Sequence, residues 1–157
     1  MSRRKKALWV LSFLFLVLVL FLLFRKPLLT GYARMFGVQT ASKGANALVC
    51  LSGGKSTRVP ETIRLWNHGY APSIYLTQVK RSNKEFSNLE KGNLWFARSI
   101  TKQMELNATW ETIPSLSGGA TSTFDEAEDV LAFGKEKGWS RIIIVTDEFH
   151  TRRAHYA

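Results

Sequence analysis

The sequence has a single cysteine, Cys50, among its 157 residues. An intramolecular disulfide is therefore impossible, and neither a zinc–cysteine cluster nor a dithiol redox pair can form. Because Cys50 lies inside an apolar run, we predict that it is a small core residue. Low-complexity segments and convincing internal repeats are also missing.

Several signatures of ester, nucleotide and metal chemistry are absent as well. The chain has no G-x-S-x-G elbow, so a catalytic triad is not supported. The phosphate loop of nucleotide triphosphatases needs a glycine five positions before Gly54, where Val49 stands. His150 and Asp147 do not form a recognised ligand spacing, so the sequence predicts no metal site.

Nucleic-acid binding is not favoured either, although the whole chain carries a formal charge of +10. Six of the 22 basic residues flank the apolar N-terminal run, so residues 27 to 157 carry 16 bases and 12 acids, a net charge of +4. That excess is mild, and aromatic residues are not interleaved with the bases. We expect no nucleic-acid partner.

A long hydrophobic run is present near the N-terminus. Residues 7 to 24 are apolar apart from Ser12, and 18 residues of helix span roughly 27 Å, close to the hydrocarbon thickness of a bilayer. The rival interpretation is a cleaved signal peptide, whose apolar region is shorter and ends at a small-residue cleavage site. Arg25, Lys26 and Pro27 follow instead. The sequence favours an uncleaved membrane anchor.

The anchor with its basic flanks covers residues 1 to 26. Four bases precede the span at residues 3 to 6 and two follow it, so the N-terminus is predicted to be cytoplasmic and the rest to lie outside. Residues 27 to 44 contain three glycines and no sustained period, which predicts a tether to the domain.

Strand-like and helix-like segments alternate from Ala45 onward. Strands are predicted at residues 47–51, 73–77, 110–113 and 141–146. Helices are predicted at about residues 60–68, 89–106 and 122–137. This alternation implies an α/β domain, with parallel strands joined by right-handed crossovers and helices on both faces of the sheet.

The sequence also predicts where the first helix begins and which face of the third helix is buried. The first helix is predicted to begin at Pro60, because proline is favoured in the first turn. The third is predicted to present four residues toward the core, and Thr123 and Glu126 match a capping box at its start. Those core-facing residues are Phe124, Ala127, Leu131 and Gly134.

Three stretches near the expected carboxyl ends of the strands could carry chemistry. The pair Gly53-Gly54 lets backbone N–H groups approach an anion, with Arg58 nearby to supply charge. The alternative is an ordinary tight turn between strand and helix. Thr121, Ser122 and Thr123 precede the third helix, where they either hydrogen-bond a ligand or only cap the helix.

The third stretch follows the last strand, where ligands bind in open α/β sheets. His150 can act as a general acid or base, with Asp147 as its partner, and these two are the predicted catalytic residues. Thr146 and Arg153 are predicted to bind the ligand. The alternative for His150 is a structural role.

These segments together resemble the domain-of-unknown-function 218 (DUF218) family, the bacterial YdcF-like and SanA-like envelope proteins. Its strand-terminal pattern V-T-S-x-[FY]-H-x-x-R-A is similar to residues 145–154, matched by Val145, Thr146, Phe149, His150, Arg153 and Ala154. Its pattern R-x-x-x-A-x-x-L-[YW]-x-x-G-x-A-P resembles Arg58, Leu65, Trp66, Gly69, Ala71 and Pro72. Its pattern S-x-N-T-x-E-N-A resembles residues 120–127, with Thr123, Asp125 and Ala127 in register.

The sequence departs from the family pattern at three places. Residues 77–79 replace a glycine-rich turn, Asp147 stands where serine is common, and Glu126 stands where the family has asparagine. These departures imply a drift in ligand chemistry. The resemblance covers residues 45–157, and because the family domain continues further, it implies an incomplete domain.

The resemblance implies a Rossmann-like domain tethered to the bacterial inner membrane and a role in envelope biogenesis. Nucleotide-like or S-adenosylmethionine-type ligands are associated with some relatives, but no cofactor or reaction is securely implied. Three hypotheses stay open: an enzyme acting on a phosphate-bearing envelope intermediate, a non-catalytic ligand-binding or regulatory module, and a truncated gene product without function.

Overall fold

The computed structural model describes residues 3–80 and 91–157, and the chain divides into two compact units, 1–36 and 37–157. The first unit contains helix α1, Arg3–Arg34. Within it, Trp9–Arg34 reaches a mean hydropathy of 2.2, so this helix is long and apolar enough to cross a membrane.

Helix α1 extends further than the predicted anchor. It continues through Pro27 to Arg34, so the first part of the predicted tether at residues 27–44 is helical. Pro27 removes one backbone hydrogen-bond donor from the helix but does not end it, and leucines at positions 28 and 29 are good helix formers.

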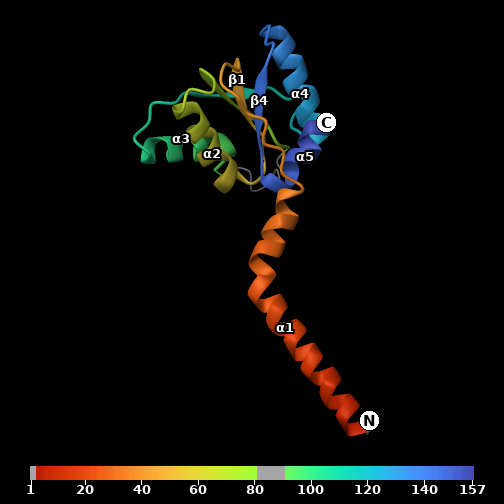
Figure 1. The fold of residues 1–157 in the computed structure, drawn as a ribbon. Helices are drawn as coiled ribbons and strands as arrows, with labels where there is room; N and C mark the ends of the chain where they lie inside the picture. The colour runs from red at the N-terminus through yellow and green to blue at the C-terminus, as the bar shows by residue number, and fades with distance from the viewer. Residues whose placement is uncertain (1–2, 81–90) are drawn as a thin grey trace. The chain divides into compact units, whose positions relative to one another are not determined.

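The second unit contains a four-stranded parallel sheet (Figure 1). Its strands are β1 (Ala47–Cys50), β2 (Ser73–Thr77), β3 (Trp110–Ile113) and β4 (Ile142–Val145), in the spatial order β3-β2-β1-β4. In the register, Cys50 lies opposite Leu76 on β2 and Val145 on β4. The predicted α/β class and parallel strands are confirmed.

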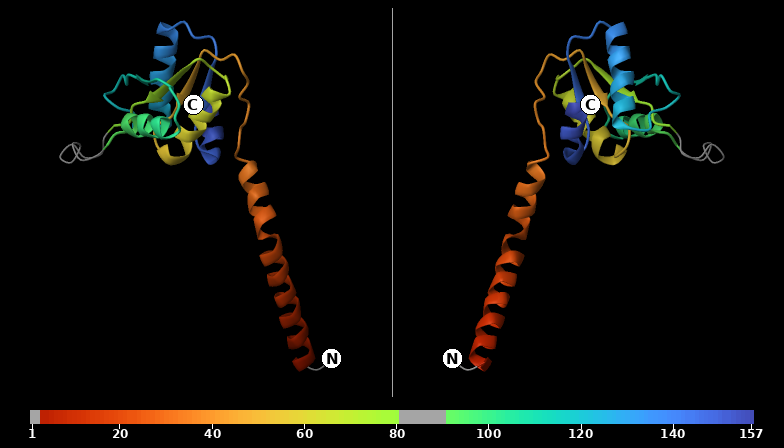
Figure 2. Two further views of the ribbon diagram at one scale, coloured as in Figure 1. Left: turned by 90° about the vertical axis from the view of Figure 1, so that its left-hand side faces the viewer. Right: turned by 90° about the vertical axis from the view of Figure 1, so that its right-hand side faces the viewer.

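Four helices cover the two faces of this sheet: α2 (Lys55–Asn67), α3 (Asn93–Gln103), α4 (Thr123–Glu136) and α5 (Glu148–Tyr156). Alternate strand residues point to opposite faces. Leu48 and Cys50 pack in the core under α2 and α3, whereas Ala47 and Val49 pack in the core under α4 and α5. Figures 1 and 2 show these two helical layers.

The burial of Cys50 confirms that it is a core residue, since only 1% of it is exposed. Burial raises the pKa of its thiol to about 11. The thiol is therefore protonated near neutral pH.

Some helix boundaries differ from the predictions. Helix α2 begins at Lys55, five residues earlier than predicted, and Pro60 lies inside it. Pro60 is the sixth residue of α2 and lies just past the N–H groups that lack helical partners, so it removes the one helical hydrogen bond that the carbonyl oxygen of Ser56 would accept without ending the helix. Helix α3 begins at Asn93, and residues 81–90, where its predicted start falls, lie outside the described residues.

The predicted inner face of α4 is wrong. Phe124 is 61% exposed and Leu131 is 59% exposed, whereas Glu126, Asp129 and Val130 are buried. Polar contacts rotate the helix away from its apolar stripe. The Asp129 carboxylate accepts a hydrogen bond of 2.8 Å from the Leu116 backbone N–H, and the Glu126 carboxylate contacts the ends of β1 and β2.

Candidate functional site

The candidate site lies at the carboxyl ends of β1 and β4. The chain leaves β1 toward β2, while β4 lies on the other side of β1, so the sheet order reverses between these two strands. The loops that follow them diverge, which leaves a crevice where open α/β sheets bind ligands. In Figure 1, α2 and α5 begin at this end, and Figure 2 shows them side by side.

A pocket of about 270 Å³ occupies this crevice. Its walls come from the turn after β1, the first turn of α2, the N-terminal part of α4, the end of β4 and the inner side of α5. The lining residues are Leu51, Ser52, Gly53, Gly54, Arg58, Thr123, Glu126, Thr146, Asp147, His150, Arg153 and Ala154. The structure thus brings together predicted residues from all three sequence stretches, although Thr123 is the one predicted residue of the second stretch that lines the pocket.

Arg58 lies at the centre of the polar contacts, with only 6% of it exposed. Its Nε and Nη2 lie 2.8 and 2.7 Å from Asp147 Oδ2. Its Nη1 donates to the carbonyl oxygens of Ser52 at 2.5 Å and Leu51 at 3.3 Å, and its Nη2 lies 3.0 Å from His150 Nδ1. These contacts account for the five N–H donors of a guanidinium. Its predicted ligand-binding role stays a prediction.

Asp147 is held on both carboxylate oxygens. Besides Arg58 on Oδ2, the Thr57 hydroxyl donates to Oδ1 at 2.5 Å. Burial alone would raise the pKa of Asp147, but hydrogen bonds from Thr57 and Arg58 and the guanidinium charge outweigh it, so the pKa is lowered. The carboxylate stays ionised and is not poised to accept a proton at neutral pH.

The glycine pair makes room for this Arg58–Asp147 arrangement. Gly53 has a φ of +114°, and a Cβ on it would lie 2.9 Å from Arg58 Nη1. A Cβ on Gly54 would lie 2.7 Å from Asp147 Oδ2. Glycine is therefore needed here partly because the Arg58–Asp147 ion pair packs closely against both positions. The predicted approach of backbone N–H groups to an anion is a separate reason.

His150 is oriented by Arg58 rather than by Asp147. An arginine always donates, so the Nδ1 atom of His150 accepts the hydrogen bond and the ring proton sits on Nε2. The distance from Nδ1 to Asp147 Oδ2 is 3.7 Å, too long for a hydrogen bond. His150 therefore presents an N–H donor from Nε2.

Glu126 lines the pocket although it was not among the predicted site residues. Its Oε1 accepts hydrogen bonds from Ser52 N at 2.8 Å, from Ser52 Oγ at 2.6 Å and from Thr77 Oγ1 at 2.5 Å. It holds the turn after β1 against the end of β2. The spacing of Thr123 and Glu126 had assigned this side chain to a capping box, which hid its position in the site.

The capping box is formed one residue earlier than predicted, by Ser122 and Asp125. Asp125 also accepts hydrogen bonds from the backbone and hydroxyl of Thr121 at 2.7 Å. Hydrogen bonds from Thr121 and Ser122 lower the pKa of Asp125 to about 2. The predicted ligand donors Thr121 and Ser122 are thus engaged in capping and lie outside the pocket lining, whereas Thr123 and Thr146 line it.

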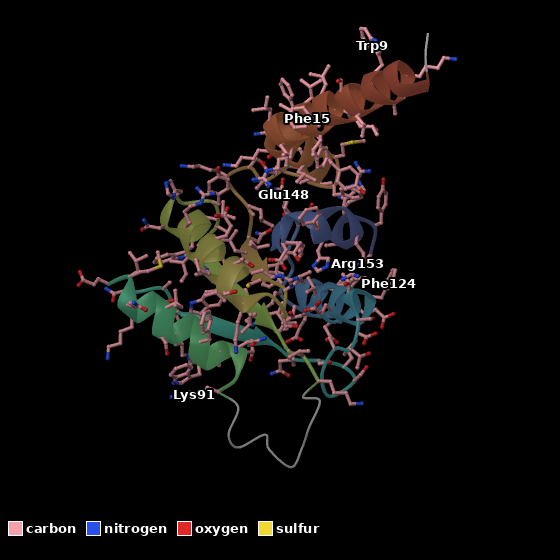
Figure 3. All side chains as sticks on the ribbon, turned by 90° about the horizontal axis from the view of Figure 1, so that it is seen from below. Trp9, Phe15, Lys91, Phe124, Glu148 and Arg153 are labelled. Atoms are coloured by element: carbon pink, nitrogen blue, oxygen red, sulfur yellow. The ribbon has the colours of Figure 1, made fainter. Side chains whose placement is uncertain are left out.

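Arg153 lines the pocket from α5 and is exposed. Figure 3 shows it on the side of α5 that faces α4. Within residues 3–80 and 91–157, no carboxylate or carbonyl accepts a hydrogen bond from its guanidinium. Nearby, Gly54 precedes α2 without a side-chain cap, and its carbonyl oxygen accepts from the N–H groups of Thr57 and Arg58, so the first-turn N–H groups left for an anion are those of Lys55 and Ser56.

The pocket therefore holds one ion pair and, among the described residues, two further charged side chains without an ion-pair partner. Arg58 and Asp147 neutralise each other, while Arg153 supplies a cation and Glu126 a carboxylate. In the part of the chain that is described, no cluster of three or more histidine, cysteine, aspartate or glutamate side chains is placed to hold a metal ion.

Comparison with known proteins adds no relative. No protein-family model, curated protein or solved structure matches the chain at a significant level. The resemblance to the DUF218 family stays a prediction, and the function must be inferred from the site.

Proposed function

We propose that this chain is a membrane-anchored protein of the bacterial cell envelope whose Rossmann-like domain lies outside the cytoplasm and binds a phosphate-bearing small molecule. The strand order β3-β2-β1-β4 supports the fold, because it is the order in one half of a doubly wound dinucleotide-binding sheet and its neighbour. The heavier basic flank before the α1 span supports the orientation.

The observation that carries the proposal is a pocket that Arg153 lines from α5 and that also reaches Gly54, the residue before the uncapped start of α2. A guanidinium with free donors and a set of backbone N–H groups is the arrangement that proteins use to bind a phosphate group. The volume of about 270 Å³ lies just below the range of sites for drug-sized ligands. It suits a phosphate with a small attached group rather than a complete dinucleotide.

Arg58 and Asp147 serve this site by positioning. Asp147 and the carbonyl oxygens of residues 51 and 52 fix the guanidinium of Arg58, which in turn fixes the ring of His150. His150 then offers its Nε2–H group to a phosphate oxygen.

The same geometry supports a second candidate function, an enzyme acting on a phosphate ester. In that role the neutral ring of His150 keeps its Nε2 proton and donates a hydrogen bond to the charge that develops on the leaving oxygen, while water attacks phosphorus and supplies the proton that this oxygen takes up. The two functions differ in the fate of the ligand. A bound molecule recovered unchanged after prolonged incubation identifies a binding module, and turnover identifies an enzyme.

Calorimetric titration of the full chain in detergent micelles with propyl phosphate tests the proposal. Replacing Arg153 by glutamine should weaken binding about tenfold or more, because it removes a charge-assisted hydrogen bond. The matched control is Arg152→Gln, which removes the same charge from an exposed neighbour outside the pocket and should change the affinity less than about twofold.

Two results would overturn the proposal. One is the absence of propyl phosphate binding at millimolar concentration. The other is an equal loss in the two variants, which would mean that the basic surface of α5 attracts anions without a defined site.

A further inference from the structure

Glu126 has one carboxylate oxygen that is not used by the protein. The residue is only 7% exposed, and all its hydrogen bonds, from Ser52 and Thr77, end on Oε1. No described residue donates to Oε2. A carboxylate oxygen in such a buried side chain is costly to leave without a donor.

This oxygen is open to the pocket rather than sealed in the core. Among the described residues, the side-chain oxygen that is both fully enclosed and without a partner is Asp129 Oδ2, not Glu126 Oε2. Glu126 itself lines the pocket, on the wall formed by α4, and Arg153 lines it from α5. Among the described residues, the Arg153 guanidinium in this pocket has no hydrogen-bond acceptor, and Glu126 Oε2 has no hydrogen-bond donor.

The Arg153 side and the Glu126 side of the pocket are suited to different chemical groups on one ligand. A single phosphate satisfies Arg153 and the N–H groups of α2, while a hydroxyl group satisfies the carboxylate. A second phosphate in the same small volume would meet the Glu126 carboxylate with like charge, so this residue also selects against diphosphates.

We infer that the ligand is the monophosphate of a polyhydroxy compound, such as a sugar or glycerol phosphate, whose hydroxyl group donates to Glu126 Oε2. This inference rests on the proposed phosphate site and names the class of molecule that it takes. Glu126 is then the specificity-determining residue, with Ser52 and Thr77 holding its Oε1 in place.

A pair of probes separates the two ends of the ligand. sn-Glycerol 3-phosphate and propyl phosphate share a three-carbon phosphate monoester and differ only in two hydroxyl groups. Titrated into the full chain in micelles, sn-glycerol 3-phosphate should bind about tenfold or more tightly, because its hydroxyl group meets a charged acceptor.

The variant Glu126→Gln tests the residue itself. Glutamine keeps an oxygen that accepts from Ser52 and Thr77 but loses the carboxylate, so the preference for sn-glycerol 3-phosphate should fall below about threefold while propyl phosphate still binds. Glu128→Gln removes the same charge from an exposed position on α4 outside the pocket and should keep the preference. The unfolding midpoint of each variant shows that the fold is retained.

Nanodiscs distinguish the two sources of such a ligand. If adding phosphatidylglycerol to phosphatidylcholine nanodiscs competes with sn-glycerol 3-phosphate, a lipid headgroup is the ligand, and if the affinity is unchanged, the ligand is soluble. Either result supports the inference.

The titration results distinguish a failure of the proposed hydroxyl contact from a failure of the proposed phosphate site. Equal binding of the two probes by the unmodified chain overturns the hydroxyl contact but leaves the phosphate site standing. Equal loss of both probes in Glu126→Gln also overturns it, because Glu126 would then act only by holding the turn. If neither probe binds, the phosphate site itself is refuted.

Discussion

Removing Arg58 should destabilise the domain through the contacts that its guanidinium makes. In Arg58→Met, the apolar stem is kept and the donors are lost. Asp147 Oδ2, the carbonyl oxygens of residues 51 and 52, and His150 Nδ1 would each lose a hydrogen bond. The acceptors lie beside a side chain that is 6% exposed, so water replaces the lost donor only in part.

The size of the effect follows from the burial of the two charges. Removing one partner of a fully buried ion pair costs about 3–5 kcal/mol. Asp147 is 28% exposed and keeps its hydrogen bond from Thr57, so we expect the lower end, about 3 kcal/mol. For a domain of this size, that loss lowers the unfolding temperature by roughly 10 °C.

Thermal unfolding of the full chain in micelles, followed by near-ultraviolet circular dichroism, measures this loss, because Trp110 is buried in the domain core. The matched control is Arg64→Met on the same helix. Among residues 3–80 and 91–157, Arg64 forms its ion pair with Glu61 alone, on an exposed face, so its removal should leave the midpoint unchanged. Equal midpoints for the two variants would refute the role assigned to Arg58.

Further predictions concern titrating groups. The folded pKa of Asp125 is about 2 and that of Asp147 is also lowered, so the stabilisation from these carboxylates is complete above about pH 5 and falls as the pH drops through the unfolded value of about 3.9 toward the folded values; an unfolding midpoint that stays flat on acidification below about pH 5 would contradict this. Long-range proton–nitrogen spectra should find the ring proton on Nε2 of His150 but on Nδ1 of His68, which faces a backbone carbonyl at 2.6 Å; the same tautomer in both would be a refutation. Native Cys50 should resist a thiol reagent at pH 8 and react only after unfolding.

Much of the sheet could be predicted from the sequence because its strands are short apolar runs. The run Ile142–Val145 has no polar alternation, as a strand covered on both faces requires, and the structure confirms it as β4. The glycine pair after residues 47–50 likewise marked the end of β1. Local composition was sufficient to predict these strands, because the same apolar residues both favour a strand and are buried in the sheet.

The helix details depended on tertiary contacts that no local pattern records. The apolar spacing of Phe124 and Leu131 predicted the inner face of α4, but the carboxylates of Glu126 and Asp129 are bound by donors from other elements, and they turn the helix. Tertiary contacts also explain why the capping box is formed by Ser122 and Asp125, one residue before the predicted pair Thr123 and Glu126. Ser122 and Thr123 both begin a capping pattern, and the position of Glu126 in the pocket leaves the cap to Asp125.

The sequence placed the candidate residues at one edge of the sheet, because the glycine turn and the His150 segment each follow a strand end, and in the structure both segments line one pocket there. The contacts between the residues of this site could not be predicted from the sequence. Sequence spacing suggested Asp147 as the partner of His150, whereas the structure places Arg58, 92 positions away in the chain, against the ring. Contacts between residues so distant in sequence become apparent only once the strand order is known.

The measurement that bears most directly on the phosphate site is an experimental structure of the full chain determined with propyl phosphate. We expect the phosphate oxygens to lie within hydrogen-bonding distance of Arg153, of His150 Nε2 and of the backbone N–H groups at the start of α2. A phosphate bound elsewhere, or a pocket left empty at a concentration that saturates the calorimetric titration, would contradict it.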